Sequence, residues 1–224
     1  MPKPGSVFAV EFLATFLLTF LGAGAILQTT SMGADGFGLL GVALAHGLAL
    51  SIGVTAAMNV SGGHVNPAIT IAMVVCGKLR PAAAPTYLAA QVLGSLVAAY
   101  LLMAMFPPDV VAQARLGTPT PAPGVSMSTV ILVEIALTFV LAVAVWGTAV
   151  DPRAPKIGGF GVGLALLCAI LVGGSITGGA LNPARVLGPA IAGGVWDMHA
   201  AYWVGPVIGA VVGSLFYKAF IYQD

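Results

Sequence analysis

The sequence predicts an all-α membrane protein with six transmembrane helices and two re-entrant half-helices, arranged as an inverted repeat. Three observations predict this fold class. Of the 224 residues, 59% are hydrophobic and 7% are charged, whereas about a quarter are charged in typical soluble domains. Six apolar stretches are long enough to cross a bilayer, which takes about 20 residues. Two short sequence patterns also occur once in each half of the chain.

The composition excludes several functional classes. Eight basic and seven acidic side chains are too few to cover a soluble globule of this length, so a soluble enzyme and a disordered chain are excluded. A net charge of +1 indicates no polyanionic partner, so no nucleic acid is expected to bind. The mean hydropathy of +1.04 makes the lipid bilayer the expected surrounding. The 30 glycines are typical of membrane helices that pack closely.

The apolar stretches place the helices. The first long stretch is expected to be a transmembrane helix and not a signal peptide that is removed. Two further apolar stretches, residues 66–77 and 182–194, are too short to cross, and each follows a glycine-rich run. Irregular backbone at membrane depth occurs only where it is buried or lines a water-filled cavity, so these two are expected to be re-entrant. The six predicted spans are residues 7–28, 39–60, 83–106, 127–149, 157–177 and 198–222.

Charged residues predict the orientation. With six spans, one side of the membrane receives most of the basic residues, and the opposite side receives most of the acidic ones. This is the positive-inside pattern, so we expect a multi-pass protein with both termini in the cytoplasm. The short termini favour a prokaryotic inner membrane. The residues of the first side are Lys3, Lys78, Arg80, Arg153, Lys156 and Lys218, and those of the second are Asp35, Asp109, Arg115 and Asp197.

The two halves of the chain repeat each other. Glu-Phe-Leu-Ala-Thr-Phe at residues 11–16 recurs as Glu-Ile-Ala-Leu-Thr-Phe at 134–139, and both halves contain Gly-Gly-X-X-Asn-Pro-Ala. Because each half has three spans, an odd number, the second half must be upside down relative to the first. In such folds the functional site lies near the midplane. We expect a single domain, 1–224, with halves at about 1–110 and 126–224 joined by a proline-rich loop.

The repeated Asn-Pro-Ala motifs are expected to begin the half-helices, since Asn is a favoured N-cap and Pro is favoured at the first helical position. Inversion brings the two positive helix ends together at the membrane centre, where they repel cations. Each capping Asn uses its carbonyl oxygen, so both of its amide N–H groups are expected to be free for a passing neutral molecule. The six motif residues are Asn66, Pro67, Ala68, Asn182, Pro183 and Ala184.

The segments before the motifs are expected to supply acceptors. Their glycines allow an extended backbone, whose carbonyl groups can form a ladder of hydrogen-bond acceptors. Donors at the centre and acceptors along the way suit a solute that both donates and accepts hydrogen bonds. A single Asn-Pro-Ala would indicate only a turn or a helix start, whereas two copies in an inverted repeat indicate a pathway. The carbonyls are those of Gly62, Gly63, His64, Gly178, Gly179 and Ala180.

On both motifs, on Arg185 directly after the second, and on the paired Glu11 and Glu134, the chain resembles aquaporins of the major intrinsic protein family over nearly its whole length. The resemblance implies a homotetramer in which each subunit has its own pore, without a cofactor, a metal or an enzymatic activity. It also implies that both glutamates accept hydrogen bonds from the motif loops, although an intramembrane carboxylate can also relay protons. Gln91 is expected to brace a loop as well.

The resemblance further implies a selectivity filter at four fixed offsets from the motifs, namely His46, Ile170, Gly179 and Arg185. This set resembles that of plant tonoplast members that also pass ammonia. It implies a passive channel for water and ammonia, with hydrogen peroxide and urea as further candidates, that excludes protons and ions. The alternative interpretation of His46 is a histidine that only packs between helices.

Two alternative functions stay open. A glycerol facilitator is disfavoured because such members carry Asp where this chain has Val186. A secondary transporter is disfavoured because the only acids within the spans are the two paired glutamates. Two structural questions also stay open. Gly205, Gly209 and Gly213 form a close-packing face, within one subunit or between subunits, and both cysteines, Cys76 and Cys168, are expected to be buried.

Overall fold

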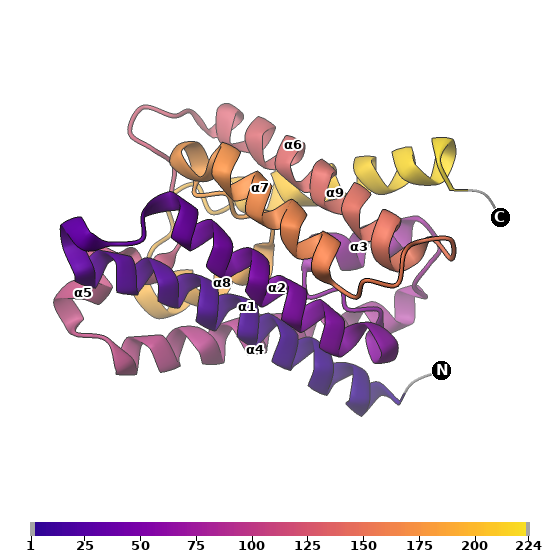
Figure 1. Ribbon diagram of the computed structural model, residues 1–224, viewed down its shortest axis with the longest axis horizontal. Coiled ribbons are helices and arrows are strands. Elements are labelled where there is room, and N and C mark those ends of the chain that lie inside the picture. The colour runs from indigo at the N-terminus through magenta and orange to yellow at the C-terminus, as the bar shows by residue number, and fades with distance from the viewer. Residues whose placement is uncertain (1–2, 223–224) are drawn as a thin grey trace.

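The structure is a computed structural model that describes residues 3–222, and every regular element within that range is helical (Figure 1). The six long helices run along the long axis of the molecule. A helix satisfies its own backbone hydrogen bonds, which lipid cannot do. The helices are α1 (Pro4–Met32), α2 (Gly38–Ser61), α3 (Pro67–Val75), α4 (Ala84–Met105), α5 (Pro108–Gln113), α6 (Met127–Val145), α7 (Phe160–Thr177), α8 (Pro183–Gly193) and α9 (Ala201–Phe220), with short 3₁₀ or π turns at Gly33–Asp35, Pro81–Ala83, Arg115–Gly117 and Trp146–Val150.

Within residues 3–222, six helical segments are long and apolar enough to cross a membrane. Their outer surfaces expose large apolar side chains, for example Leu132 at 66% and Phe220 at 77%, whereas Glu11 and Glu134 are completely buried. This distribution is the reverse of that in a soluble protein. The chain is therefore an integral multi-pass membrane protein, as predicted, and the predicted spans differ from the observed helices by only a few residues at each end.

The two halves are built alike. In the first, α1 packs against α2 and α4, and in the second, α6 packs against α7 and α9, while α2 and α7 join the halves. Each half-helix packs against a long helix of the other half, α3 against α9 and α8 against α4. In Figure 1, α3 lies towards the end of the molecule that holds both chain ends, and α8 lies towards the other end. The short helices therefore enter from opposite sides.

Glycines set the close contacts between the long helices. A Cβ on Gly213 would lie 2.7 Å from the carbonyl oxygen of Phe139, and one on Gly205 would lie 2.7 Å from the Cβ of Glu134. The glycine face of α9 therefore packs against α6 within the same subunit, which the sequence left undecided. The backbones can approach this closely because these positions have no side chain.

Two features of the sequence analysis need correction. Cys76 is buried, but Cys168 is exposed on α7, so the expectation that both are buried was wrong for Cys168. Since α7 is apolar on all sides, its sequence does not mark the face that points outwards. The helix α5 was also not predicted within the proline-rich loop. Its signal was Pro107-Pro108-Asp109, a proline at the first helical position followed by an acid in the first turn.

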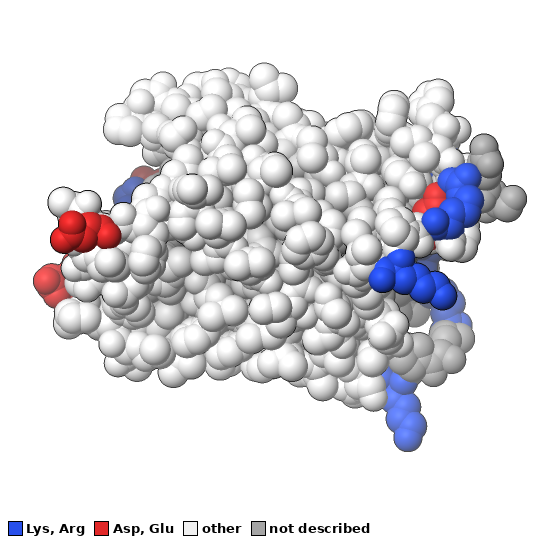
Figure 2. All heavy atoms as spheres, viewed as in Figure 1, with Lys and Arg blue, Asp and Glu red and all other residues white. Residues whose placement is uncertain are grey.

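Charged side chains gather at the two ends of the molecule (Figure 2). We name the end at which α1 begins and α9 ends the basic end. Lys78, Arg153 and Lys218 lie there by their hydrogen bonds to Tyr222, Ile221 and Cys76. The terminus and the connections on the same side also carry Lys3, Arg80 and Lys156. We name the other end the opposite end. It carries Asp35, Asp109 and Asp197, and the Asp197 carboxylate pairs with Arg115 at 2.9 Å. The wide middle zone between the ends is free of exposed charge in the view of Figure 2, as a membrane-spanning surface requires.

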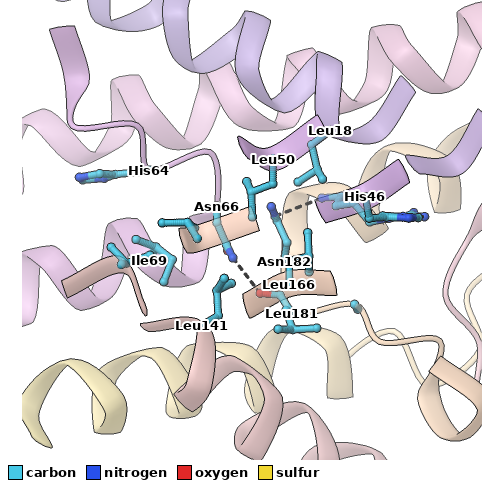
Figure 3. A pocket seen from close by; sticks show the side chains of 14 residues that line it. Leu18, His46, Leu50, His64, Asn66, Ile69, Leu141, Leu166, Leu181 and Asn182 are labelled. Atoms are coloured by element: carbon cyan, nitrogen blue, oxygen red, sulfur yellow. Dashed lines mark hydrogen bonds between the residues drawn. The ribbon is translucent and has the colours of Figure 1, made fainter. Parts of the chain in front are cut away.

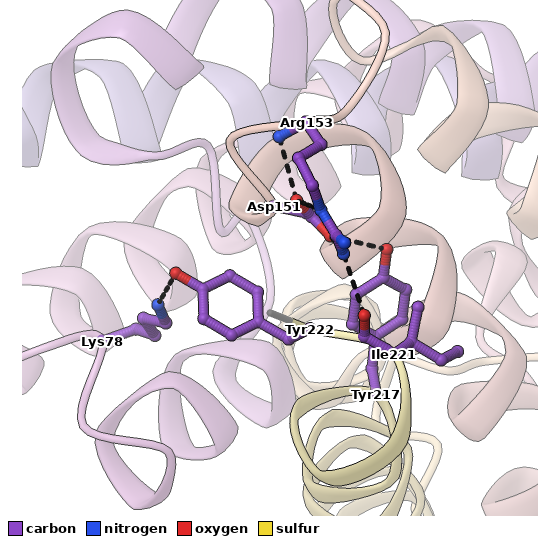
Figure 4. A network of polar contacts seen from close by, with 6 residues as sticks. All are labelled: Lys78, Asp151, Arg153, Tyr217, Ile221 and Tyr222. Carbon is purple, nitrogen blue, oxygen red and sulfur yellow. Dashed lines mark hydrogen bonds and ion pairs between the residues drawn. The ribbon is translucent and has the colours of Figure 1, made fainter. Parts of the chain in front are cut away.

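A polar network at the basic end ties two connections to the end of α9 (Figure 4). The Arg153 guanidinium donates from Nε to Asp151 Oδ1 at 2.9 Å and from Nη2 to the carbonyl of Ile221 at 2.8 Å. The hydrogen bonds that Arg153 donates to the Asp151 carboxylate hold the pKa of Asp151 well below its usual value. Lys78, just after α3, donates to the Tyr222 hydroxyl at 3.0 Å. The loop after α6 and the turn after α3 are thus both fastened to α9.

Candidate functional site

The two half-helices begin at the centre of the molecule. Asn66 precedes α3, and its Oδ1 accepts the backbone N–H of Ala68 at 2.9 Å. Asn182 precedes α8, and its Oδ1 accepts the N–H groups of Ala184 and Arg185 at 3.1 and 3.2 Å. A proline follows each Asn as the first helical residue. Both helices are therefore capped by the asparagine, and their positive ends face each other.

Each asparagine also crosses to the opposite loop. Asn66 Nδ2 donates to the carbonyl of Leu181 at 2.8 Å, and Asn182 Nδ2 donates to the carbonyl of Val65 at 2.9 Å. The expectation that both N–H groups of each amide stay free was therefore wrong, because one of the two holds the halves together. Val65 and Leu181 have φ angles of 58° and 52°, which turn their carbonyls towards the asparagines. One amide N–H of each Asn remains available for a solute.

Glu11 holds the loop before α3. Its Oε1 accepts the Ser61 hydroxyl at 2.6 Å and the N–H of His64 at 2.9 Å. Its Oε2 accepts the N–H of Val65 at 2.7 Å and the Gln91 amide at 2.9 Å. Four donors thus surround a completely buried carboxylate, which replaces the hydration it has lost.

Glu134 holds the loop before α8 in the same way. Its Oε1 accepts the Thr177 hydroxyl at 2.7 Å and the N–H of Ala180 at 3.0 Å. Its Oε2 accepts the N–H of Leu181 at 2.8 Å. The two carboxylates therefore turn the N–H groups of both loops away from the centre, so that the carbonyl groups point the other way.

Some carbonyl groups of the two loops accept a hydrogen bond from the protein, and others do not. The carbonyls just before the glycines, those of Ser61 and Thr177, accept the hydroxyls of Tyr87 and Tyr202 at 2.8 and 2.6 Å. Within residues 3–222, no protein donor reaches the next three carbonyls of either loop. These six carbonyls therefore have no hydrogen-bond donor among the described residues, and they belong to Gly62, Gly63, His64, Gly178, Gly179 and Ala180.

The structure brings His46 and Arg185 into contact. His46 Nδ1 lies 2.8 Å from the carbonyl of Val42, which can only accept, so the ring hydrogen is on Nδ1. Nε2 then accepts from Arg185, at 3.0 Å from Nη2 and 3.3 Å from Nε. The Nη1 group of Arg185 is buried and has no protein partner within the described chain. A fixed positive charge with one unused donor therefore lies beside the neutral imidazole.

One cavity passes both asparagines, and Figure 3 shows His64 and His46 on opposite sides of them. Its remaining wall is mainly apolar. Sequence reasoning missed four leucines of this wall, although they occupy matching positions, seven residues after each paired glutamate or sixteen before each motif asparagine. The lining residues are Leu18, His46, Leu50, His64, Asn66, Ile69, Leu141, Val145, Val162, Leu166, Ala180, Leu181, Asn182 and Arg185.

The other two predicted filter residues lie next to each other. A Cβ on Gly179 would lie 3.3 Å from the Cα of Ile170. Ile170 also lines a hollow with Thr118, Thr120 and Gly178, residues beside or within the loop from α5 to α6. Of the four predicted filter residues, His46 and Arg185 line the central cavity and Ile170 lines this hollow, while Gly179 adjoins Ile170.

Comparison with known proteins covers almost the whole chain. The family model Major intrinsic protein matches residues 5–217. Aquaporin TIP4-4 of Zea mays is 41% identical, over 95% of this chain and 86% of the relative. Aquaporin A of Dictyostelium discoideum is 36% identical, over 96% of this chain and 78% of the relative. The solved aquaglyceroporin from Plasmodium falciparum superposes with a TM-score of 0.85 at 27% identity, covering 98% of this chain and 97% of the other.

These similar proteins all come from eukaryotes. The expectation of a prokaryotic inner membrane, which rested only on the short termini, is therefore not borne out.

Proposed function

The chain belongs to the major intrinsic protein family, and from this premise we propose that it is a passive channel for water that also passes ammonia. Members of this family with its aquaporin fold are channels and not enzymes. Water is the first substrate, and ammonia, hydrogen peroxide and urea are the further neutral solutes that the predicted filter suits.

The observation that carries the proposal is the arrangement of donors and acceptors along one cavity. The amides of Asn66 and Asn182 each keep one N–H group at the centre, after the crossing bonds to the opposite loops. The unused carbonyls of residues 62–64 and 178–180 supply acceptors on the two sides. The leucines between them offer no hydrogen bonds. A water molecule can then exchange hydrogen bonds with the wall, and the apolar surface between sites prevents tight binding.

The same arrangement accounts for the exclusion of ions and protons. The positive ends of α3 and α8 meet at the centre, and Arg185 places a full positive charge in the cavity. Cations, including hydronium, are repelled by both features. An anion would have to give up its hydration in a narrow channel with apolar walls, which is costly.

The filter favours ammonia as the second solute. His46 accepts from Arg185, so its ring is neutral and tied to the guanidinium. Ile170 supplies an apolar side chain and Gly179 supplies none. An opening of this kind is less polar than one with a second histidine at position 170. Ammonia can pass it because ammonia gives up its hydration at a lower cost than an ion does.

The alternatives are supported less well. Val186 is completely enclosed beside Arg185 and brings no carboxylate to the pathway for a polyol, which disfavours glycerol. A secondary transporter needs an acid that is free to bind a coupling ion, yet Glu11 and Glu134 are occupied by loop donors. We further propose that the basic end faces the cytoplasm, by the positive-inside rule, and that four subunits assemble.

The test is water and ammonia permeability on the same proteoliposomes, with water read by light scattering and ammonia by an internal pH dye. Vesicles that contain the parent protein should take up both water and ammonia faster than empty vesicles, without any ion gradient. His46→Phe with Ile170→His should lower the ammonia-to-water ratio several-fold, because the Phe ring fills the wall and the new His adds a polar group. An unchanged ratio in the folded double variant would show that these positions do not form the filter, and a parent without water flux would overturn the channel.

A further inference from the structure

We propose that Gly22 of α1 is a positioning residue for the pathway, because it provides the space in which the His46 ring is seated. The inference rests on the proposed function and deepens it, since it adds a position outside the four expected filter residues. A Cβ built on Gly22 would lie 2.5 Å from His46 Nε2 and 2.9 Å from Cε1, and closer still to Cδ2. All three nearest neighbours of that position are therefore atoms of this one ring.

The backbone does not need a glycine at position 22. Gly22 lies inside the 29-residue helix α1 and is not among the glycines with a positive φ angle. Glycine is one of the poorest helix formers, so a helix interior usually has a reason for keeping one. Glycines of neighbouring helices have such a reason in close backbone contacts, for example Gly94 against the carbonyl of Phe12. At Gly22 the neighbour is a side chain of the pathway instead.

The ring cannot move away without cost, because both of its nitrogens are engaged. Nδ1 is held by the Val42 carbonyl, and Nε2, the atom closest to the pathway charge, accepts from Arg185. His46 is only 4% exposed. A methyl group at position 22 would push the ring off α1, towards Arg185 and the cavity that both residues line. The expected result is a narrower opening and a distorted contact with Arg185.

The other half of the molecule shows the alternative solution. Gly22 lies eleven residues after Glu11, and the residue eleven after Glu134 is Val145. His46 lies twenty residues before Asn66, and the residue twenty before Asn182 is Val162. Val145 and Val162 both line the same cavity as His46. A bulky ring therefore accompanies glycine in one half, and a smaller side chain accompanies valine in the other, as expected if the two positions share one volume.

The experiment measures whether positions 22 and 46 are coupled. Gly22→Ala should lower the osmotic water permeability of proteoliposomes by about tenfold, because overpacking moves the ring into the pathway. His46→Ala removes the ring, so Gly22→Ala should change the permeability of that variant by less than about twofold. Gly24→Ala is the matched control. It lies two residues away on α1, where a Cβ would meet only a methyl group of Leu102 at 3.2 Å, and it should keep the parent's permeability.

The outcomes separate this inference from the proposed function. The proposal that Gly22 provides space for the His46 ring would be overturned by an unchanged water permeability of Gly22→Ala. It would also be overturned if Gly22→Ala lowered the permeability equally with and without the His46 ring. If Gly22→Ala does not fold, the double variant with His46→Ala should fold, and its failure would show that Gly22 serves only helix packing. If the parent itself conducts no water, the proposed function fails. The coupling is then read from thermal unfolding of the four proteins, where Gly22→Ala should lower the midpoint only when the ring is present.

Discussion

The re-entrant loop of the first half and that of the second half are held in the same way. A carboxylate in each half, Glu11 or Glu134, accepts one hydroxyl and two backbone N–H groups from its loop. Asn66 and Asn182 each donate to the carbonyl just before the other. The cavity lining is repeated only in part, because leucines and asparagines recur at matching positions while other lining side chains differ. In one half, His46 lies between Gly22 and Arg185. The positions that match His46, Gly22 and Arg185 in the repeat hold Val162, Val145 and Ile69, in that order.

This difference shows which parts of the molecule the lipid surrounding constrains. Every buried N–H and carboxylate needs a partner where water is absent, so the supporting hydrogen bonds are repeated in both halves. The lining contacts only the solute and its own neighbours, so it can change in one half alone. The cavity thus carries the polar pair His46 and Arg185, whereas the matching positions of the repeat, Val162 and Ile69, are apolar.

The largest effect is expected from removing one of the two hydrogen bonds by which Asn66 and Asn182 join the loops at the centre. In Asn182→Asp, a carboxylate replaces the amide, and its oxygen faces the Val65 carbonyl instead of donating to it. We expect water permeability to fall by at least about tenfold, since a buried acceptor pair without a hydrogen costs several kcal/mol. Asn66→Asp is the matched variant and should lose a similar factor through Leu181. Unchanged water flux and cation exclusion in folded Asn182→Asp would contradict the central role of the donors.

A smaller effect concerns the carboxylates. Glu134→Gln places an amide N–H group among three donors, and Glu11→Gln places one among four. Each variant should lose about 3 kcal/mol of unfolding free energy, measured by thermal unfolding in detergent, because a hydrogen bond to a charged group becomes a donor–donor contact. The loss should be greater for Glu11→Gln.

Gln91→Leu sharpens this comparison. It removes the fourth donor of Glu11 and leaves the three-donor arrangement of the other half. Gln91 Nε2 also donates to the Thr70 hydroxyl at 3.0 Å. Because two hydrogen bonds are lost, we expect a loss of about 2 kcal/mol, about 1 kcal/mol for each. A loss as large as that of Glu11→Gln would mean that Gln91 contributes more than these two hydrogen bonds.

The smallest effect concerns the connections after the first helix of each half. Asp151 follows α6 and bonds to Arg153, whereas Asp35 follows α1 and is exposed. The pKa of Asp151 is depressed in the folded protein, so its stabilisation is present above the unfolded pKa, near 4, and is lost as the pH falls below it. Asp151→Asn should lower the unfolding temperature slightly at about pH 7 and less at about pH 3. Asp35→Asn is the control, and a constant difference between parent and Asp151→Asn across this range would contradict the prediction.

Local signals in the sequence were sufficient to predict the arrangement of the helices. The length of the apolar runs, the order Asn-Pro at two helix starts and the repeated Glu patterns predicted six spans, two half-helices and their inversion. These features depend on a single segment at a time, because hydrophobic length and helix capping are properties of short stretches. The helix α5 shows the limit, since its signal was hidden in a loop rich in proline.

Only the tertiary structure decided how the side chains meet. Helices that are apolar on all sides do not reveal which face turns inwards. The sequence therefore left the partner of the α9 glycines open and misplaced Cys168. It also could not show that half of the amide donors of Asn66 and Asn182 are used by the opposite loop, nor that His46 lies over Gly22. Each of these contacts joins segments far apart in the chain, and it exists only when close packing fixes the rotation of every helix.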